Sequence, residues 1–233
     1  MFERPFGLAE INREARNIRP RICAVIVNRD VKIPEELLPL IDFFEVRIDL
    51  IGAGWQDVAS MLHCPWLATD RSPLEGGRGE ADEDERLANL SEAVGLGASM
   101  VDVELSMKNA ARAVSGFRPR AICVVSFHDF NGMPTYERLV EIVKRQIAAG
   151  ADICKVVTTA GDFADNITML RLIKAFPQTR MVALAMGAQG MTSRILSPLA
   201  EGYFTYASLE RGKESAPGQL TVAELREIYQ MLK

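Results

Sequence analysis

A closed (β/α)₈ barrel of class α/β, the TIM barrel, is the fold that this sequence predicts, and three features predict it. Short apolar runs rich in β-branched residues occur eight times along the 233 residues. A segment with helical spacing of apolar residues follows each run, and no Pro/Ser-rich linker or low-complexity stretch interrupts the alternation. Strict alternation of strands and helices leaves two main architectures, the closed barrel and the doubly wound open sheet.

The segment after the first strand favours the barrel. A doubly wound nucleotide-binding sheet usually carries the glycine motif G-x-G-x-x-G at this position. Here the residues are Asn28-Arg29-Asp30-Val31, without a glycine. We therefore expect residues 1–233 to form a single barrel domain, with residues 1–20, which carry no motif, as a candidate N-terminal extension.

The eight predicted strands are mostly continuous in apolar residues. This pattern is typical of parallel strands that are covered on both faces, whereas a half-exposed strand would alternate. The strands are expected at residues 22–27, 43–48, 66–69, 100–105, 121–127, 153–158, 181–185 and 203–207.

The predicted helices fill the segments between the strands. The clearest pattern, at residues 134–150, places Leu139, Ile142, Val143 and Ile147 on one face and Gly150 where a helix would end. Acidic residues 80–85 open another helix, because negative charge suits the positive end of the helix dipole. A capping box of Thr221 and Glu224 opens the C-terminal helix. Further helical patterns occupy residues 34–40, 55–63, 107–114, 165–176 and 192–200.

The composition excludes several classes of partner. The chain is 48% hydrophobic and 25% charged, with 27 basic and 31 acidic residues, so its formal net charge is −4. This is an ordinary globular composition. The basic residues are scattered, which argues against a nucleic-acid or membrane-surface binder. We therefore expect a small-molecule substrate and neither a nucleic-acid nor a membrane partner.

The cysteines and the N-terminal residues indicate a reducing compartment. The four cysteines have no CxxC spacing, and we interpret them as reduced thiols. No apolar stretch approaches the roughly 18 residues that span a bilayer. Residues 1–10 carry charges where a signal peptide needs an apolar region. These features predict a cytoplasmic location.

Lys155 is a charged residue within the apolar run Ile153-Cys154-Lys155-Val156-Val157. Burial disfavours the ammonium form, and a neutral amine on a barrel strand is suited to forming a Schiff base with a ketone or aldehyde. The alternatives are a structural ion pair with an inward carboxylate and a lysine at a frayed strand end.

His128 follows another strand, in Ser126-Phe127-His128-Asp129-Phe130, and is one of two histidines in the chain. A histidine at the carboxyl end of a barrel strand can act as a base and then as an acid near neutral pH. The alternative is a hydrogen-bonded structural residue. With so few histidines, and cysteines outside any metal-ligand spacing, we expect no metal site.

Further charges are predicted at the same rim of the barrel. Glu45, Arg47 and Asp49 alternate along one predicted strand, which places them on one face. Because a closed barrel has no edge strand, this face is expected to line a polar pocket rather than a solvated edge. Taken singly, each of the remaining charges is more typical of a surface charge than of a site residue; they are Arg71, Glu75, Glu104 and Arg194.

Together these residues resemble the type I 3-dehydroquinate dehydratases, from about residue 22 to the C-terminus. The motifs that carry the resemblance occur in family order: Glu45-Val46-Arg47-Ile48-Asp49, Thr69-Asp70-Arg71-Ser72 with Glu75-Gly76-Gly77, Val101-Asp102-Val103-Glu104-Leu105, Ser126-Phe127-His128-Asp129-Phe130, Gly150-Ala151-Asp152-Ile153-Cys154-Lys155 and Ser215-Ala216-Pro217-Gly218-Gln219.

The resemblance implies a hydro-lyase that converts 3-dehydroquinate to 3-dehydroshikimate in the shikimate pathway to chorismate and aromatic amino acids. It further implies a (β/α)₈ barrel, usually a homodimer. No external cofactor is implied, because the reaction would proceed through a covalent imine between Lys155 and the substrate. His128 would be the general acid/base, oriented by Glu75. The implied substrate-binding residues are Glu45, Arg47, Arg71, Arg194, Ser215 and Gln219.

Two departures from the family pattern bear on the site. Val46 stands where the family often has an aromatic residue, and we expect it to face away from the pocket. Asp70 stands where the family often has an apolar residue, and it could pair with Arg71 and so compete with substrate. A mobile lid is expected at residues 211–218, which end in Pro217-Gly218.

Two other functions are compatible with a barrel of this kind. A class I aldolase also uses a Schiff-base lysine, but it would usually need a phosphate site after strands seven and eight. Those loops contain Ser193, Arg194 and Ser215 and no glycine-rich phosphate cradle. A non-catalytic barrel that binds a metabolite or a protein is disfavoured because both Lys155 and His128 are present.

Overall fold

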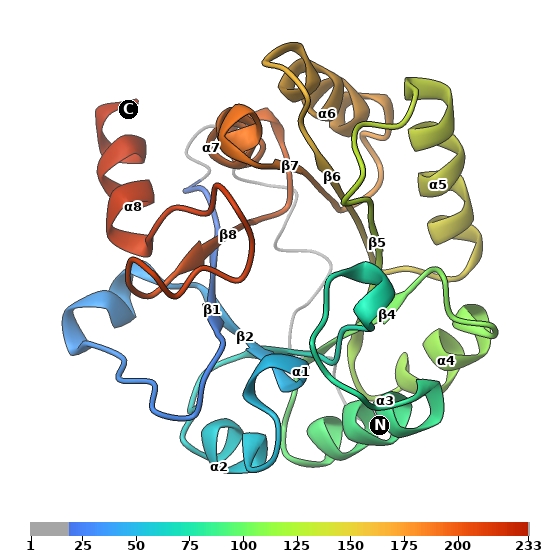
Figure 1. Ribbon diagram of the computed structural model, residues 1–233, viewed down its shortest axis with the longest axis vertical. Coiled ribbons are helices and arrows are strands. Elements are labelled where there is room, and N and C mark those ends of the chain that lie inside the picture. Colours follow the sequence, from blue (N-terminus) through green and yellow to red (C-terminus); the bar gives the residue numbers. More distant parts are fainter. Residues whose placement is uncertain (1–18, 233) are drawn as a thin grey trace.

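The computed structural model describes residues 19–232 and confirms the predicted architecture. Eight parallel strands form a barrel, and helices surround it (Figure 1). Residues 1–18 of the expected N-terminal extension lie outside the described residues. The assignment of residues 1–233 to one domain therefore stays a prediction.

The strands follow one another around the barrel in chain order, with β8 next to β1. Each predicted strand is present, with its ends within two residues of the expected positions. The strands are β1 (Ile22–Ile26), β2 (Phe43–Arg47), β3 (Trp66–Thr69), β4 (Met100–Glu104), β5 (Ile122–His128), β6 (Ile153–Thr159), β7 (Met181–Met186) and β8 (Thr205–Ser208).

The barrel is nearly closed. Parallel pairing joins β8 to β1 and then every neighbouring pair as far as β7. Within residues 19–232, no strand pairing joins β7 to β8, where the backbone N–H of Tyr203 donates to the carbonyl of Met181 (2.7 Å). This contact lies just before the short strand β8 begins.

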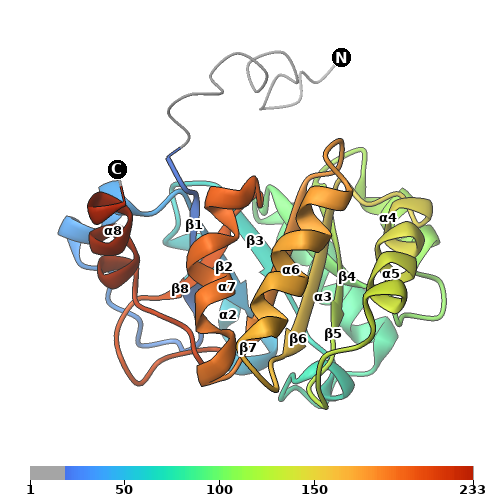
Figure 2. The same cartoon turned by 90° about the horizontal axis from the view of Figure 1, so that it is seen from above.

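The helices cover the outside of the barrel, and Figure 2 shows α6 and α7 lying side by side along it. The α-helices are α1 (Ile48–Ile51), α2 (Trp55–Ser60), α3 (Glu83–Gly95), α4 (Ala110–Phe117), α5 (Tyr136–Ala148), α6 (Ala164–Ala175), α7 (Met191–Leu196) and α8 (Val222–Met231). Short 3₁₀ helices are η1 (Glu35–Leu40), η2 (Pro73–Glu75), η3 (Ala188–Gly190) and η4 (Pro198–Ala200).

Alternation along each strand separates two layers of side chains. Residues such as Val46, Val103 and Val156 face outward and belong to apolar clusters with the helices, as expected for Val46. The residues between them face the barrel interior. There the amino-terminal ends of the strands contribute an apolar cluster, in which the rings of Phe43 and Phe204 meet edge to face with centroids 4.9 Å apart.

The interior changes from apolar to charged along several strands. On β2 the inward residues are Phe43, Glu45 and Arg47, and on β6 the apolar Ile153 is followed by Lys155. The apolar layer fills the amino-terminal end of the barrel. The charged residues therefore gather at the carboxyl ends of the strands, where barrel enzymes place their active sites.

The prediction that Asp49 continues the strand of Glu45 and Arg47 is wrong. Strand β2 ends at Arg47, and Asp49 lies in the short helix α1. Its carboxylate folds back and accepts hydrogen bonds from Arg47 Nε (2.9 Å) and Nη2 (2.7 Å). Asp49 therefore holds Arg47 in place instead of lining the pocket itself.

Candidate active site

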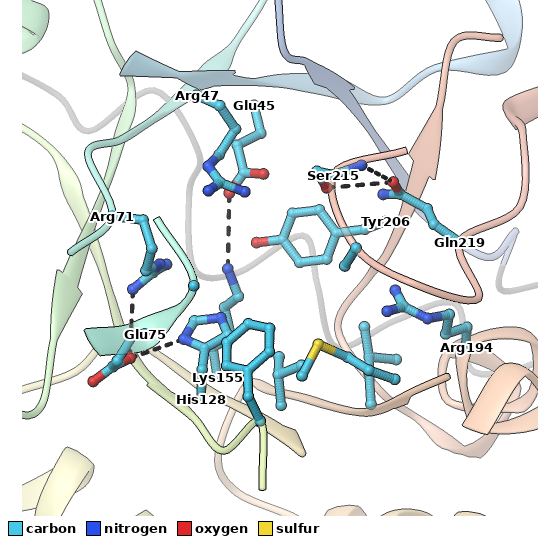
Figure 3. A pocket seen from close by; sticks show the side chains of 16 residues that line it. Glu45, Arg47, Arg71, Glu75, His128, Lys155, Arg194, Tyr206, Ser215 and Gln219 are labelled. Carbon is cyan, nitrogen blue, oxygen red and sulfur yellow. Dashed lines mark hydrogen bonds and ion pairs between the residues drawn. The ribbon is translucent and has the colours of Figure 1, made fainter. Parts of the chain in front are cut away.

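One pocket opens at the carboxyl ends of the strands, and it brings together the nine residues to which the family resemblance assigns a role in catalysis or substrate binding (Figure 3). They come from β2, β5 and β6, from the segment after β3, from α7 and from the segment after β8. The pocket is lined by Glu45, Arg47, Arg71, Glu75, Gly76, His128, Phe130, Lys155, Val157, Leu184, Met186, Arg194, Tyr206, Ser215, Ala216 and Gln219.

Lys155 lies at the base of this pocket and is 4% exposed. Its Nζ is 3.0 Å from Asp102 Oδ2 and 3.7 Å from Glu45 Oε1. The ring of Tyr206 lies beside the amine, with its centroid 4.5 Å from Nζ. The ion pair that the sequence left as an alternative is thus present, and two carboxylates offset part of the cost of burying the ammonium group. The same amine is the only lysine nitrogen among the pocket-lining residues.

Asp102 is the shared partner of two buried cations. Its Oδ2 lies 3.0 Å from Lys155 Nζ and 2.8 Å from Arg71 Nη2, and its Oδ1 accepts a hydrogen bond from Ser126 Oγ (2.5 Å). Burial opposes ionisation of this carboxyl group, but Arg71 and Lys155 outweigh burial and lower its pKa to about 2. Asp102 is therefore an anion throughout the neutral pH range.

Arg71 contacts acidic groups on three sides. Besides Asp102, its Nη1 lies 3.4 Å from Glu104 Oε1 and 3.7 Å from Glu75 Oε2. Burial disfavours the guanidinium charge, yet these carboxylates raise the pKa of Arg71 above its usual value. Arg71 also donates to Ser126 Oγ (2.7 Å).

The predicted pairing of Asp70 with Arg71 is wrong. Arg71 forms ion pairs with carboxylates of the pocket, whereas the Asp70 carboxylate accepts a hydrogen bond from Asn89 of α3 (2.8 Å). Adjacent residues at a strand end point to opposite sides, so Asp70 faces the surrounding helices while Arg71 faces the barrel interior. Asp70 consequently does not compete with substrate for Arg71.

His128 and Glu75 form a second pair beside the lysine. His128 Nδ1 lies 2.9 Å from Glu75 Oε2, and Ser106 Oγ donates to the other carboxylate oxygen (2.6 Å). Burial, together with Arg71, Lys155 and Arg47, lowers the pKa of His128 well below its usual value. Burial raises the pKa of Glu75 to about 7, although Arg71 counteracts it. His128 is thus a neutral base at neutral pH, next to a carboxyl group that titrates there.

The backbone around Glu75 explains why its side chain points into the pocket. Helix η2 ends at Gly76, whose φ of +83° lies in the region that favours glycine. A Cβ atom at Gly77 would lie 1.8 Å from the carbonyl oxygen of Arg71, so only glycine fits there. The Glu75-Gly76-Gly77 sequence therefore forms a tight turn that places Glu75 against His128.

The mouth of the pocket contains a buried guanidinium group. Arg194 is 3% exposed, and its only described hydrogen bond is from Nη2 to the carbonyl of Pro217 (3.3 Å). No carboxylate within residues 19–232 lies in ion-pair distance of Arg194, and its Nε has no hydrogen-bond partner there. Burial lowers the pKa of Arg194 to about 10, so it remains a cation at neutral pH. A buried cation of this kind favours an anionic ligand.

Ser215 and Gln219 complete the mouth from the segment after β8. Ser215 donates to Gln219 Oε1 from its backbone N–H (2.8 Å) and its hydroxyl (3.3 Å). The backbone N–H of Gly187, at the end of β7, donates to the carbonyl of Pro217 (3.1 Å). The segment predicted to be a lid thus lines the mouth of the pocket next to Arg194, and its mobility stays a prediction.

Three residues of the site were not predicted as functional from the sequence. Asp102 is a charged residue within the apolar strand β4, and a charge within an apolar strand is the same signal that pointed to Lys155. The pairing of Asp102 with Lys155 could not be identified without the strand register. Ser126 and Tyr206 gave no signal, because a serine and an aromatic residue are ordinary on barrel strands. The inward alternation of β8 brings Tyr206 to the pocket, and that of β5 places Ser126 beneath it, against Arg71 and Asp102.

Within the described part of the chain, no cluster of histidine, cysteine, aspartate or glutamate side chains could hold a metal ion. None of the described helices is long and apolar enough to cross a membrane.

A family model described as Type I 3-dehydroquinase matches residues 22–233. The chain belongs to this family. The 3-dehydroquinate dehydratase of Dehalococcoides mccartyi is 42% identical over 214 residues, which cover 90% of this chain and 95% of that protein. The match to the dehydroquinase family confirms the resemblance found in the sequence motifs.

Solved structures of dehydroquinases have the same fold. The 3-dehydroquinate dehydratase from Geobacillus kaustophilus superposes with a TM-score of 0.78 at 26% identity, over 92% of this chain and 91% of that chain. The type I enzyme from Clostridium difficile, with covalent modified comenic acid, gives a TM-score of 0.78 at 23% identity over 93% of each chain. The barrel is therefore the fold of the dehydroquinase family.

The shared role of Asp102 predicts a large loss of stability on its removal. Asp102→Ala leaves Lys155 and Arg71 buried without their common carboxylate, so we expect the free energy of unfolding to fall by about 3–5 kcal/mol. Urea denaturation measures it. Asp57→Ala is the control, because Asp57 is 80% exposed in its pair with Arg29 and should change stability by less than about 1 kcal/mol. Equal effects of the two substitutions would contradict the role of Asp102.

The His128–Glu75 pair predicts the pH dependence of turnover. Below about pH 7 Glu75 is protonated and no longer anchors the Nδ1–H of His128, so kcat/KM should fall as the pH decreases through this value. In Glu75→Gln this titration is absent, and the acid limb should move to lower pH while kcat falls about 10-fold or more. Initial rates across the pH range measure both. An acid limb that stays in place in Glu75→Gln would show that another group titrates.

Proposed function

We propose that this chain is a 3-dehydroquinate dehydratase, which removes water from 3-dehydroquinate to give 3-dehydroshikimate through a Schiff base at Lys155. The observation that carries the proposal is the arrangement of three groups around one pocket: the Lys155 amine at its base, the neutral His128 beside Glu75 in its wall, and the buried cation Arg194 at its mouth. Membership of the type I 3-dehydroquinase family supports the same reaction.

The lysine begins the reaction. After losing a proton, the Lys155 amine attacks the C3 ketone, and loss of water gives an iminium ion. The iminium withdraws electrons from the adjacent C2–H bond and acidifies it. The pairing of Lys155 with Asp102 and Glu45 supports this step, since it places carboxylates next to the nitrogen that becomes a cation. A covalently modified ligand is also described for the relative from Clostridium difficile.

His128 then acts first as a base and next as an acid. The neutral ring removes the C2 proton to form an enamine, and the imidazolium protonates the departing C1 hydroxyl, which leaves as water. The hydrogen bond with Glu75 fixes the ring through Nδ1 and leaves Nε2 free for the transferred proton. Hydrolysis of the conjugated imine releases the product and regenerates Lys155.

The remaining polar residues would hold the substrate. Arg194, Ser215 and Gln219 lie together at the mouth, where the unpaired guanidinium suits the substrate carboxylate. Glu45 and Arg47, from β2, are placed to hold ring hydroxyl groups, with Glu45 fixed by a hydrogen bond from Thr69 (2.8 Å).

Arg71 lines the pocket and also contacts the buried groups beneath it. Its contacts with Asp102, Glu104 and Ser126 occupy most of its guanidinium group. We therefore assign Arg71 both to the substrate hydroxyl groups and to the position of Asp102.

We also propose that the chain is a cytoplasmic homodimer that needs no external cofactor and no nucleic-acid or membrane partner. This proposal is supported by the family resemblance and by the composition. Light scattering on the purified chain tests the dimer.

The aldolase and the non-catalytic barrel are not favoured by any observation. A Schiff-base aldolase would need a phosphate cradle, whereas the mouth offers Arg194 and the Ser215–Gln219 segment that suit a carboxylate. A binding protein would not need a neutral histidine beside a buried amine.

The ultraviolet absorbance of the conjugated enone in the product tests the proposed function. We expect Lys155→Ala to abolish the rise in absorbance with 3-dehydroquinate, because the imine cannot form. His128→Ala should lower turnover by about 100-fold or more while the substrate still binds. Lys174→Ala is the control, since this lysine is 54% exposed in a pair with Glu201 and neither residue lines the pocket. Wild-type rates in either the Lys155 or the His128 variant would defeat the mechanism.

A further inference from the structure

Tyr206 is a buried polar residue of the pocket that the proposed mechanism leaves unused. It lies on β8, is 5% exposed and lines the same pocket as Lys155. Its hydroxyl group is buried and has no hydrogen-bond partner within the described residues. Leaving a buried hydroxyl unpaired is unfavourable, so such a group at a binding site indicates a ligand that supplies the partner.

The position of the Tyr206 ring is fixed by its neighbours. Phe204 meets it edge to face, with centroids 5.1 Å apart and an angle of 77° between the rings. Its face contacts the Lys155 amine, with 4.5 Å between Nζ and the ring centroid. Figure 3 shows the hydroxyl directed at the centre of the pocket, close to this amine. The unpaired hydroxyl is thus held beside the atom that would become covalently attached to substrate.

His128 and Tyr206 approach the amine from different sides. His128 is on β5, next to β6, whereas Tyr206 is on β8 next to β1. In Figure 3 the two rings lie on opposite sides of the Lys155 amine. The carbon bonded to this amine, C3, has two ring neighbours, C2 and C4. Because His128 must face C2 to remove its proton, Tyr206 faces the side of C4, which carries a hydroxyl group in 3-dehydroquinate.

We propose that Tyr206 is a substrate-binding residue whose phenolic hydroxyl forms a hydrogen bond with the C4 hydroxyl of the substrate. This inference rests on the proposed function, because the reaction at Lys155 defines which carbon lies next to Tyr206. Burial raises the pKa of Tyr206, so the phenol stays protonated and is available as a donor. The ring face also continues to contact the nitrogen when the ammonium is replaced by the iminium cation.

The hydroxyl would make the site selective for a substrate that is oxygenated at C4. A ligand with hydrogen at this carbon would leave the Tyr206 hydroxyl buried and unpaired, and sites of this kind reject such analogues. A merely structural tyrosine would fill the same space but would not distinguish the two ligands.

The test combines one substitution with one change in substrate. Tyr206→Phe keeps the ring and removes the hydroxyl. With 3-dehydroquinate we expect kcat/KM to fall about 3- to 10-fold, which corresponds to one hydrogen bond. With the 4-deoxy analogue of 3-dehydroquinate, wild type and Tyr206→Phe should have the same kcat/KM, because the partner is already absent.

Two controls separate this effect from folding. Tyr229→Phe also removes a buried hydroxyl, one that donates to the carbonyl of Ile195 (3.0 Å) away from the pocket, and its kinetics should equal those of wild type. Since Tyr206→Phe removes an unpaired group, its melting temperature should not fall below that of wild type. If that variant did not fold, Tyr206→Met, which also lacks the hydroxyl, would be required to prefer 3-dehydroquinate over the 4-deoxy analogue by about 3-fold less than wild type does.

Two results would overturn the role of Tyr206. One is an unchanged kcat/KM of Tyr206→Phe with 3-dehydroquinate, and the other is an equal loss with both substrates. Either result, obtained while wild type still produces the enone, leaves the proposed function intact. Absence of the enone with wild type would instead overturn the proposed function, and the assignment of Tyr206 with it.

Discussion

The ion pair between Lys155 and Asp102 is the interaction on which the rest of the structure depends. An amine can react at the base of a barrel only if it is removed from bulk water, and a buried ammonium group needs a partner there. Asp102, on β4 and separated from β6 by β5, provides that partner and shares its charge with Arg71. Arg71 in turn contacts Glu75 and Glu104, so the charges of this end of the barrel form one connected network.

This network is supported by the division of the barrel interior into two layers. The apolar layer around Phe43 and Phe204 fills the amino-terminal end and needs no polar partners. The charged layer at the carboxyl ends of the strands does need such partners, and the buried ions Lys155, Asp102 and Arg71 face one another there, whereas Arg194 at the mouth has no carboxylate partner among the described residues. The same layer fixes the chemistry: burial, together with the nearby cations, lowers the pKa of His128 and keeps its ring neutral, and burial raises the pKa of Glu75 to about 7. Stability and reactivity therefore depend on the same few contacts.

The fold and most of the site could be predicted because they depend on patterns of residues that are close together in the sequence. Apolar runs of strand length predicted the barrel, and charges within or just after those runs, such as Lys155 and His128, predicted the pocket. Contacts between distant segments could not be predicted in this way. Strand β2 ends at Arg47, so Asp49 lies in a helix and not on the strand. The partner of Arg71 is Asp102 of β4 and not its neighbour Asp70. The residue at which β2 ends decided the first case, and the faces taken by Asp70 and Arg71 decided the second; the spacing of apolar residues determines neither.

Reduction with borohydride in the presence of 3-dehydroquinate tests the central claim most directly. Borohydride converts an imine into a stable secondary amine, so the peptide that contains Lys155 should gain the mass of the reduced ligand, and Asp102→Ala should diminish this labelling if the variant folds. We expect modification at Lys155 and at no other lysine. An unmodified Lys155 peptide after reduction, under conditions in which the enzyme turns over its substrate, would contradict covalent catalysis by this residue.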